Sequence, residues 1–294
     1  MGIVLGLLTA LSWGSADLCA RFATRKIGTL RAMLYMQLTG FVLLTAALHR
    51  FGGWGHLADG SGWKPWAWGL LVGTLNTCGT LALYRSFEIG KMSIVAPISS
   101  SYPALTMLLA TTTGERLTAV RLAGFALILL GVVVVARGEE VPGDANPIDA
   151  QLQPAKKHLG VGWALFSAIA FGVMFWILGV RAVPLIGSAQ TVWIIRLISV
   201  ILTAIVILTL RRPMRLPGAG ANGWILGIGI LDTSAYVLNN YGMRLEQVSV
   251  VSVLASLYGA VTVGLAATFL GEKISKTQWL GIVAIFAGIV LISR

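Results

Sequence analysis

Residues 93–112 read SIVAPISSSYPALTMLLATT, and residues 249–268 read SVVSVLASLYGAVTVGLAAT. Aligned without a gap, the two stretches are identical at nine of 20 positions. The identical pairs are Ser93 with Ser249, Val95 with Val251, Ser100 with Ser256, Tyr102 with Tyr258, Ala104 with Ala260, Thr106 with Thr262, Leu109 with Leu265, Ala110 with Ala266 and Thr112 with Thr268. After a slip of one residue, Gly114-Glu115 meets Gly271-Glu272. This internal repeat predicts a chain built from two similar halves.

Long apolar runs fill the sequence around the repeat. The chain is 56% apolar and 11% charged, whereas an ordinary soluble domain is about a quarter charged. A bilayer core needs roughly 20 apolar residues in a helix, and cutting the chain at charges, Gly and Pro gives ten such runs. They are residues 2–21, 31–49, 65–85, 92–113, 117–136, 159–180, 188–210, 222–243, 248–270 and 277–293. Because lipid offers backbone groups no partners, these runs predict transmembrane helices.

A polar stretch between the fifth and sixth runs divides the ten runs five and five. It carries Pro142, Pro147 and Pro154, which is typical of a linker. We therefore expect a first repeat at residues 1–137, a linker at 138–158 and a second repeat at 159–294. Because five is odd, the second repeat enters the membrane from the opposite side. The predicted fold is an all-α integral membrane protein of ten transmembrane helices in two inverted five-helix repeats, which suits alternating access.

Lys and Arg are unevenly divided between the two sets of loops. The loops after the first, third, fifth, seventh and ninth runs hold fourteen, and the opposite ends hold seven. Cytoplasmic loops carry an excess of Lys and Arg, so we expect the first set in the cytoplasm and both termini outside. The predicted location is the plasma membrane, which is the inner membrane of a bacterium.

Several classes of function find no support in the sequence. The formal net charge of +11 is spread thinly and forms no basic stripe, so we expect no nucleic-acid partner. Cys19 and Cys78 fall in apolar runs, and His49, His56 and His158 lie near loops, so we expect no metal site. Neither a nucleophile with a nearby base nor a phosphate loop occurs. We therefore expect neither an enzyme nor a cofactor.

Two polar stripes fall at membrane depth. The eighth run carries Asp232, Tyr236, Asn239, Asn240 and Met243 at the spacing of one helix face. The third run carries Gly73, Asn76, Thr77, Thr80 and Tyr84 at equivalent positions. Such stripes either line a cavity or bond neighbouring helices together. We favour a cavity, because bonding alone does not require aromatic residues alternating with amides in both halves.

Two prolines, Pro97 and Pro103, interrupt the fourth run around Tyr102. Each proline removes a backbone donor, so the run forms either a broken helix whose free carbonyls serve a ligand, or a simple kink. In the ninth run Gly259 stands in place of Pro103. There we expect close packing or a hinge without the kink.

Charges inside the predicted spans leave further alternatives open. Arg196 and Asp232 fall near the middle of adjacent antiparallel spans, where they form either a structural ion pair or a site that grips both ends of a zwitterion. Asp17 lies one turn from Arg21 and either pairs with it or acts as a proton-coupling carboxylate.

Small residues give the fifth and tenth runs matching faces. Gly124 and Gly131 in one run correspond to Gly281 and Gly288 in the other. Such faces allow close packing of membrane helices. We expect a monomer, or a weak dimer formed through these two spans.

The sequence resembles the drug/metabolite transporter superfamily, in particular its ten-span EamA-type branch. The resemblance rests on residues 10–15 (ALSWGS), a weaker echo at residues 168–172, and the repeated Gly-Glu pairs. It covers essentially the whole chain and implies a cavity lined by spans 1, 3, 4, 6, 8 and 9, with spans 5 and 10 peripheral. Within the superfamily the chain is similar to YddG-type amino-acid exporters. Members are often drawn with cytoplasmic termini, whereas the charge count here places the termini outside.

Together these features predict a secondary transporter that exports aromatic or neutral amino acids, or related small metabolites. The expected substrate-binding residues are Trp13, Asn76, Thr80, Tyr84, Ser100, Tyr102, Arg196, Asp232, Tyr236, Asn240, Ser256 and Tyr258. An alternative is proton-coupled efflux of cationic drugs, for which Asp17 or Asp232 would exchange the proton. An alternative from another class is a membrane receptor or scaffold that transports nothing. A small solute and membrane lipid are the expected partners.

Overall fold

The computed structural model describes residues 1–51, 53–57, 59–114, 118–137, 160–245 and 248–292. Every regular element within these residues is helical. The first half contains α1 (Gly2–Ile27), α2 (Thr29–Phe51), η1 (Gly55–Leu57), α3 (Lys64–Ile89), α4 (Met92–Ser99), α5 (Pro103–Ala110), η2 (Thr111–Thr113) and α6 (Ala119–Arg137). The second half contains α7 (Val161–Ile177), the π-helical η3 (Leu178–Ala182), α8 (Val183–Ile186), α9 (Ser188–Thr209), α10 (Ala219–Leu245), α11 (Val248–Ser256), α12 (Tyr258–Phe269) and α13 (Lys276–Ile292).

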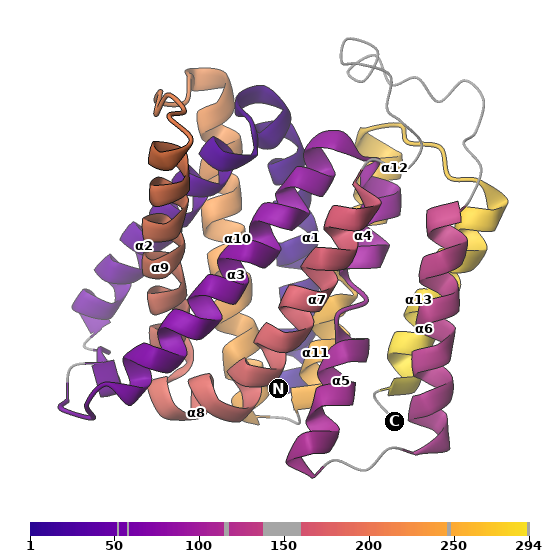
Figure 1. The fold of residues 1–294 in the computed structure, drawn as a ribbon, viewed down its shortest axis with the longest axis horizontal. Coiled ribbons are helices and arrows are strands. Elements are labelled where there is room, and N and C mark those ends of the chain that lie inside the picture. The colour runs from indigo at the N-terminus through magenta and orange to yellow at the C-terminus, as the bar shows by residue number, and fades with distance from the viewer. Residues whose placement is uncertain (52, 58, 115–117, 138–159, 246–247, 293–294) are drawn as a thin grey trace.

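Helix occurs in each of the ten predicted apolar runs. Seven helical segments of the described residues are long and apolar enough to cross a membrane by length and composition. The all-helical prediction is thereby confirmed, while the count of ten crossings and the inversion of the second half stay predictions. The start of α1 and the end of α13 lie at the same end of the bundle (Figure 1).

The first helix is longer than its apolar run. The prediction ended it at Arg21 because a charge usually marks the end of a span, whereas α1 continues to Ile27. The Arg21 side chain is buried, and its guanidinium donates to the carbonyl oxygen of Gly90 over 2.6 Å. Because the protein itself satisfies this charge, it does not have to lie in water.

The fourth run is a broken helix, one of the two alternatives that its prolines left open. Helix α4 ends at Ser99 and α5 begins at Pro103. Proline is favoured in the first turn of a helix because its missing N–H has no partner to lose there. Tyr102 precedes Pro103 at the start of α5, and the break therefore holds the tyrosine between the two helices.

The ninth run is also interrupted, which corrects the expectation of an unkinked helix. Helix α11 ends at Ser256 and α12 begins at Tyr258. Around Leu257 the hydrogen bonds span three residues: its N–H donates to Leu254 O over 3.2 Å, and Ala260 N–H donates to Leu257 O over 2.9 Å. No proline marks this break in the sequence.

The two interruptions pack against each other. A Cβ atom on Gly259 would lie 2.7 Å from the Cβ of Ser100 and 3.3 Å from the carbonyl oxygen of Ala96. Any side chain on Gly259 would force these backbones apart. The glycine in place of the second proline therefore permits α12 to cross the first break.

Helices in equivalent places of the two halves exchange contacts. Helix α1 packs on α10, α11 and α12, and α7, its counterpart, packs on α3, α4 and α5. Helix α2 packs on α10 as α9 packs on α3. The halves therefore do not fold side by side; each half contributes to the centre of the bundle.

Helices α6 and α13 form a pair at one side of the bundle (Figure 1). A Cβ added to Gly124 would lie 2.8 Å from the carbonyl oxygen of Gly288. A Cβ added to Gly131 would lie 2.7 Å from the carbonyl oxygen of Gly281. The small faces predicted for these spans thus meet within one chain. A dimer would have to use the outer faces of α6 and α13, and the oligomeric state stays a prediction.

Candidate functional site

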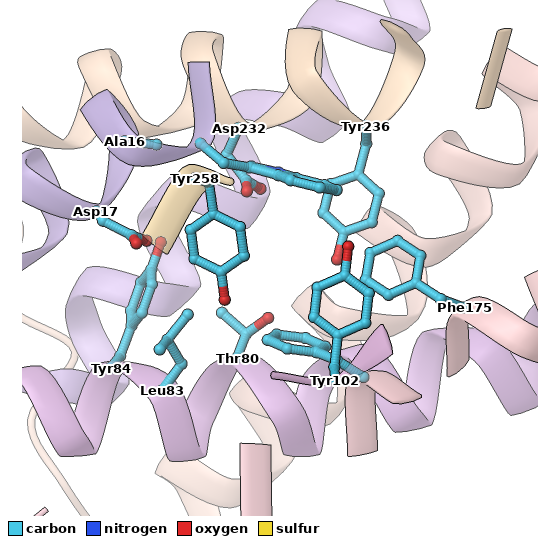
Figure 2. Close-up of a pocket in the computed structure, with 12 residues that line it drawn as sticks. Ala16, Asp17, Thr80, Leu83, Tyr84, Tyr102, Phe175, Asp232, Tyr236 and Tyr258 are labelled. Atoms are coloured by element: carbon cyan, nitrogen blue, oxygen red, sulfur yellow. The ribbon is translucent and has the colours of Figure 1, made fainter. Parts of the chain in front are cut away.

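A cavity lies inside the bundle, between the helices that carry the two polar stripes. Its free volume is about 30 Å³, room for roughly one or two water molecules, whereas small-molecule sites span about 300 to 1,000 Å³. A solute could therefore enter only if the helices that line the cavity move apart. The wall comes from α1, α3, α7, α10 and α12 and from Tyr102 (Figure 2). The lining residues are Trp13, Ala16, Asp17, Thr80, Leu83, Tyr84, Tyr102, Phe171, Phe175, Asp232, Tyr236 and Tyr258.

Aromatic rings form most of the wall. The ring of Trp13 meets those of Phe175, Tyr236 and Tyr258 edge-on, with centroids 5.7, 5.1 and 5.9 Å away. Tyr102 stacks on Phe175 at 4.7 Å. Such pairs contribute about 0.5 to 1.5 kcal/mol beyond the burial of their area. A solute in the cavity would therefore meet ring surfaces that already hold one another in place.

Asp17 of α1 brings the first of two carboxylates to the cavity. Its Oδ2 accepts a hydrogen bond from Thr262 Oγ1 of α12 over 2.8 Å. Arg21, one turn further on, instead donates to the Gly90 carbonyl and lies 3.7 Å from Glu272 Oε1. In the described part of the chain, Asp17 is thus joined to a hydroxyl and not to Arg21, the pairing that the spacing had suggested.

Asp232 of α10 brings the second carboxylate. Its Oδ2 lies 2.6 Å from the guanidinium of Arg196 on α9, so the two charges meet as their positions in adjacent spans predicted. The Asp232 side chain is 14% exposed, and that of Arg196 is 0% exposed. Arg196 also donates to Gln37 Oε1 over 2.6 Å and lies 5.2 Å from the centre of the Tyr236 ring. The carboxylate therefore stands between the cavity and the guanidinium.

The ionisable charges of the cavity wall are acidic. Among the described residues that line it, Asp17 and Asp232 are acidic and none is Lys, Arg or His. The described residues also contain no group of three or more His, Cys, Asp or Glu that could hold a metal ion. A lining with charge of one sign in surroundings of low polarity attracts solutes of the opposite charge.

Tyr236 connects the cavity wall to a polar network between the helices. Its hydroxyl donates to Asn76 Oδ1 over 2.7 Å, and Asn76 Nδ2 donates to Ser199 Oγ over 3.1 Å. Thr77 Oγ1 bonds to the same Ser199 hydroxyl over 2.9 Å. The polar stripes thus do both things that the sequence left open, because Tyr236 faces the cavity while Asn76 and Thr77 bond to α9.

Both halves of the chain match one known protein family. Residues 1–137 and residues 158–294 each match the model of the EamA-like transporter family. The chain belongs to this family. It is therefore a multi-pass membrane protein of the drug/metabolite transporter superfamily and a transporter of small solutes, not an enzyme.

Two similar proteins extend the comparison. The uncharacterized protein MJ1333.1 of Methanocaldococcus jannaschii is 29% identical over 135 residues, which are 46% of this chain and 95% of that protein. A chain about as long as one half thus exists by itself. A solved structure described as "Crystal structure of protein" superposes with a TM-score of 0.69 at 18% identity, covering 99% of this chain and 95% of that one. That likeness concerns the fold alone.

In this EamA-family protein, Glu272 joins the segment after α12 to the start of α4. Its two carboxylate oxygens accept hydrogen bonds from the backbone N–H groups of Met92, over 3.1 Å, and Ser93, over 2.8 Å, at the start of α4. Unpaired N–H groups at a helix start favour a negative charge. The second Gly-Glu pair thereby acquires a physical role, while Glu115 of the first pair lies outside the described residues.

Five of the predicted substrate-binding residues lie behind the cavity wall. They are Asn76, Ser100, Arg196, Asn240 and Ser256. The hydroxyls of Ser100 and Ser256 donate to backbone carbonyls three residues earlier, over 3.1 and 2.7 Å. The Asn240 amide donates to the Ser188 carbonyl over 3.1 Å. These groups are buried because the protein's own backbone and neighbouring helices satisfy them.

Four apolar lining residues were missed, namely Ala16, Leu83, Phe171 and Phe175. Phe171 lies within the weak echo of the first span, at residues 168–172, and Phe175 follows one turn later. The similarity of residues 168–172 to the first span could therefore have indicated that Phe171 and Phe175 line the cavity. A search for polar residues at membrane depth could not have found them.

Proposed function

We propose that this transporter carries small organic solutes that combine a protonated amine with a flat apolar body. The observation that carries the proposal is the orientation of the ion pair: Asp232 lines the cavity, and Arg196 is fully buried behind it. A solute inside the cavity would meet carboxylates and aromatic rings before any positive charge. This favours the alternative of cationic solutes over the zwitterion site that the sequence suggested.

The aromatic wall supports the same choice. A cation over the face of a Trp or Tyr ring is attracted by about 0.5 to 2 kcal/mol, the larger value applying where water is excluded. Tyr236 and Tyr258 line the same cavity as Asp17 and Asp232 (Figure 2). The ring of Trp13 contacts both tyrosine rings. Rings beside a carboxylate would bind the charge and the apolar part of an aromatic amine together.

Aromatic and neutral amino acids are the second candidate substrates. Their carboxylate would need donors, and hydroxyls on the wall offer them. Among the described residues, the Tyr258 hydroxyl makes one long hydrogen bond, of 3.4 Å, to Ser99 Oγ. Thr80 and Tyr84 also line the cavity. An amino acid would nevertheless bring its carboxylate close to two acidic side chains, which costs free energy in a site of low dielectric constant.

Exchange of the solute against protons fits the two different carboxylates. The Asp232 carboxylate has a guanidinium partner, whereas the described partner of Asp17 is the hydroxyl of Thr262. We therefore infer that Asp17 takes up a proton when the organic cation leaves.

Alternating access is the mechanism that the arrangement of the helices supports. Equivalent helices of the two halves pack across the centre, so an exchange of their conformations would open the cavity first to one side and then to the other. The contacts of Glu272 with the start of α4 would close one end and would have to break when that end opens.

Flux in proteoliposomes tests the proposed function. We would follow ethidium as an aromatic cation and labelled phenylalanine as an amino acid, each with and without a pH gradient. Saturable ethidium uptake driven by an opposing proton gradient is the expected result, with loss of uptake in Asp232→Asn and retention in Asp59→Asn, a carboxylate exposed outside the bundle.

The other outcomes separate the alternatives. Saturable exchange of phenylalanine without ethidium uptake would refute the cation proposal and support the second candidate. Flux of neither probe, nor of other amines and amino acids, would favour a receptor or scaffold. Because Asp232→Asn leaves Arg196 buried without its partner, the double variant Arg196→Gln with Asp232→Asn keeps the test valid if the single variant does not fold.

A further inference from the structure

A second hollow opens at the surface of the bundle. It lies where α1 turns into α2 and where α9 ends, and its volume is about 650 Å³. The lining residues are Ile27, Gly28, Thr29, Leu30, Arg31, Leu81, Arg85, Glu88, Trp163, Ile207, Leu210, Arg212 and Pro213. They come from five helices (α1, α2, α3, α7 and α9), from Gly28 between α1 and α2, and from the segment that follows α9.

The hollow carries excess positive charge. Glu88 is the acidic residue of the lining, and its Oε2 lies 2.8 Å from Arg85 and accepts a bond from Thr29 over 2.6 Å. Arg85 and Glu88 thus neutralise each other. Arg31 and Arg212 have no acidic partner among the described residues, and Arg31 uses only its Nε, which donates to the Ile27 carbonyl over 2.7 Å. Two guanidinium groups therefore remain for an anion.

The rest of the lining is apolar and continues onto the outer surface. Trp163 is 48% exposed, and Leu210 is 56% exposed. Beyond them lie Phe166 on α7 and Leu208 on α9, both also largely exposed. The hollow is therefore not a closed pocket, because one side of it continues into exposed apolar surface.

We propose that this hollow binds one anionic phospholipid. The phosphate group would lie against Arg31 and Arg212, and an acyl chain would run along Leu81, Leu210 and Trp163. Basic pockets between membrane helices recognise anionic head groups, and tryptophan is enriched at the level of the head groups. The hollow also lies at the end of the bundle whose loops hold the larger share of Lys and Arg, where anionic lipid is attracted.

Native mass spectrometry of the purified full chain tests the proposal directly. The detergent solution would contain equimolar phosphatidylglycerol and phosphatidylcholine. One retained phosphatidylglycerol is expected, and Arg31→Gln or Arg212→Gln should each lower its retention about fivefold, since a basic residue near the head group contributes about 1 kcal/mol. Arg212→Lys should keep the preference. Arg50→Gln, at the opposite end of α2, is the matched control and should change nothing.

The remaining outcomes count against the proposal. Equal retention of the two lipids by the natural chain would refute it, as would an unchanged preference in both glutamine variants. Glycerol 3-phosphate tests the source of the anion. If it displaces phosphatidylglycerol at equal concentration, the hollow is a site for soluble phosphates and the lipid assignment is wrong. The measurement does not depend on any transport activity.

Discussion

Gly259 of α12 lies so close to Ser100 that a Cβ on the glycine would stand 2.7 Å from the Cβ of the serine. Gly259→Ala should therefore destabilise the protein by about 1 to 3 kcal/mol, the usual cost of overpacking, and lower the midpoint of thermal unfolding in detergent. Gly264→Ala on the same helix is the control, because nothing lies within 4 Å of its added Cβ. Ser100→Gly should restore part of the loss, and failure to do so would refute the crossing as its cause.

The hydrogen bond between Tyr236 and Asn76 predicts that removing the tyrosine hydroxyl alone destabilises the protein. Tyr236→Phe removes the donor and leaves the buried Asn76 Oδ1 without it, which should cost about 1 to 3 kcal/mol. Tyr241→Phe, on the same helix and 46% exposed, should cost almost nothing. Thermal unfolding of the two variants measures the difference, and equal midpoints would contradict the assigned bond.

The Arg196–Asp232 pair predicts that a second substitution can restore stability without restoring transport. Asp232→Asn leaves a buried guanidinium unpaired and should destabilise the protein by about 3 to 5 kcal/mol. Adding Arg196→Gln should recover much of this stability. It should not recover cation uptake, because the carboxylate that faces the cavity is still absent. Recovery of uptake in the double variant would remove Asp232 from the proposed site.

The contact of Glu272 with the start of α4 predicts a change in access to the cavity. In a background of Cys19→Ala and Cys78→Ala, we would introduce Thr80→Cys on the cavity wall and measure its reaction with a membrane-impermeant thiol reagent. Glu272→Ala should increase labelling from the end where Glu272 lies. The control Glu88→Ala, at the same end but outside this contact, should not. Unchanged labelling in Glu272→Ala would refute the closing role.

Much of the site was predictable wherever helix periodicity alone decides position. Asp232 and Tyr236 lie one turn apart in the eighth run, and both face the cavity. Arg196 was placed near Asp232 because adjacent spans run antiparallel, and the two charges do meet. Which partner would face the cavity was not predictable, because the depth of a side chain depends on the third helix behind it, here α2 with Gln37.

The differences from the sequence prediction have equally local causes. Ser100 and Ser256 do not line the cavity, because each hydroxyl donates to a backbone carbonyl three residues earlier; their role in substrate binding stays a prediction. The interruption at Leu257 contains no proline and lies two residues before the close crossing at Gly259. Arg21 looked like the end of a span, since its partners lie more than sixty residues away in sequence.

The crossing of α6 with α13 has a consequence for how the two halves could be made. Each of these helices ends its own half, and each presses its glycines against the backbone of the other. The interface between the halves is therefore built from residues that each half already carries. Residues 1–137 and 159–294, synthesised as two separate polypeptides in one cell, should therefore assemble. The fold would then not require a covalent connection between the two halves.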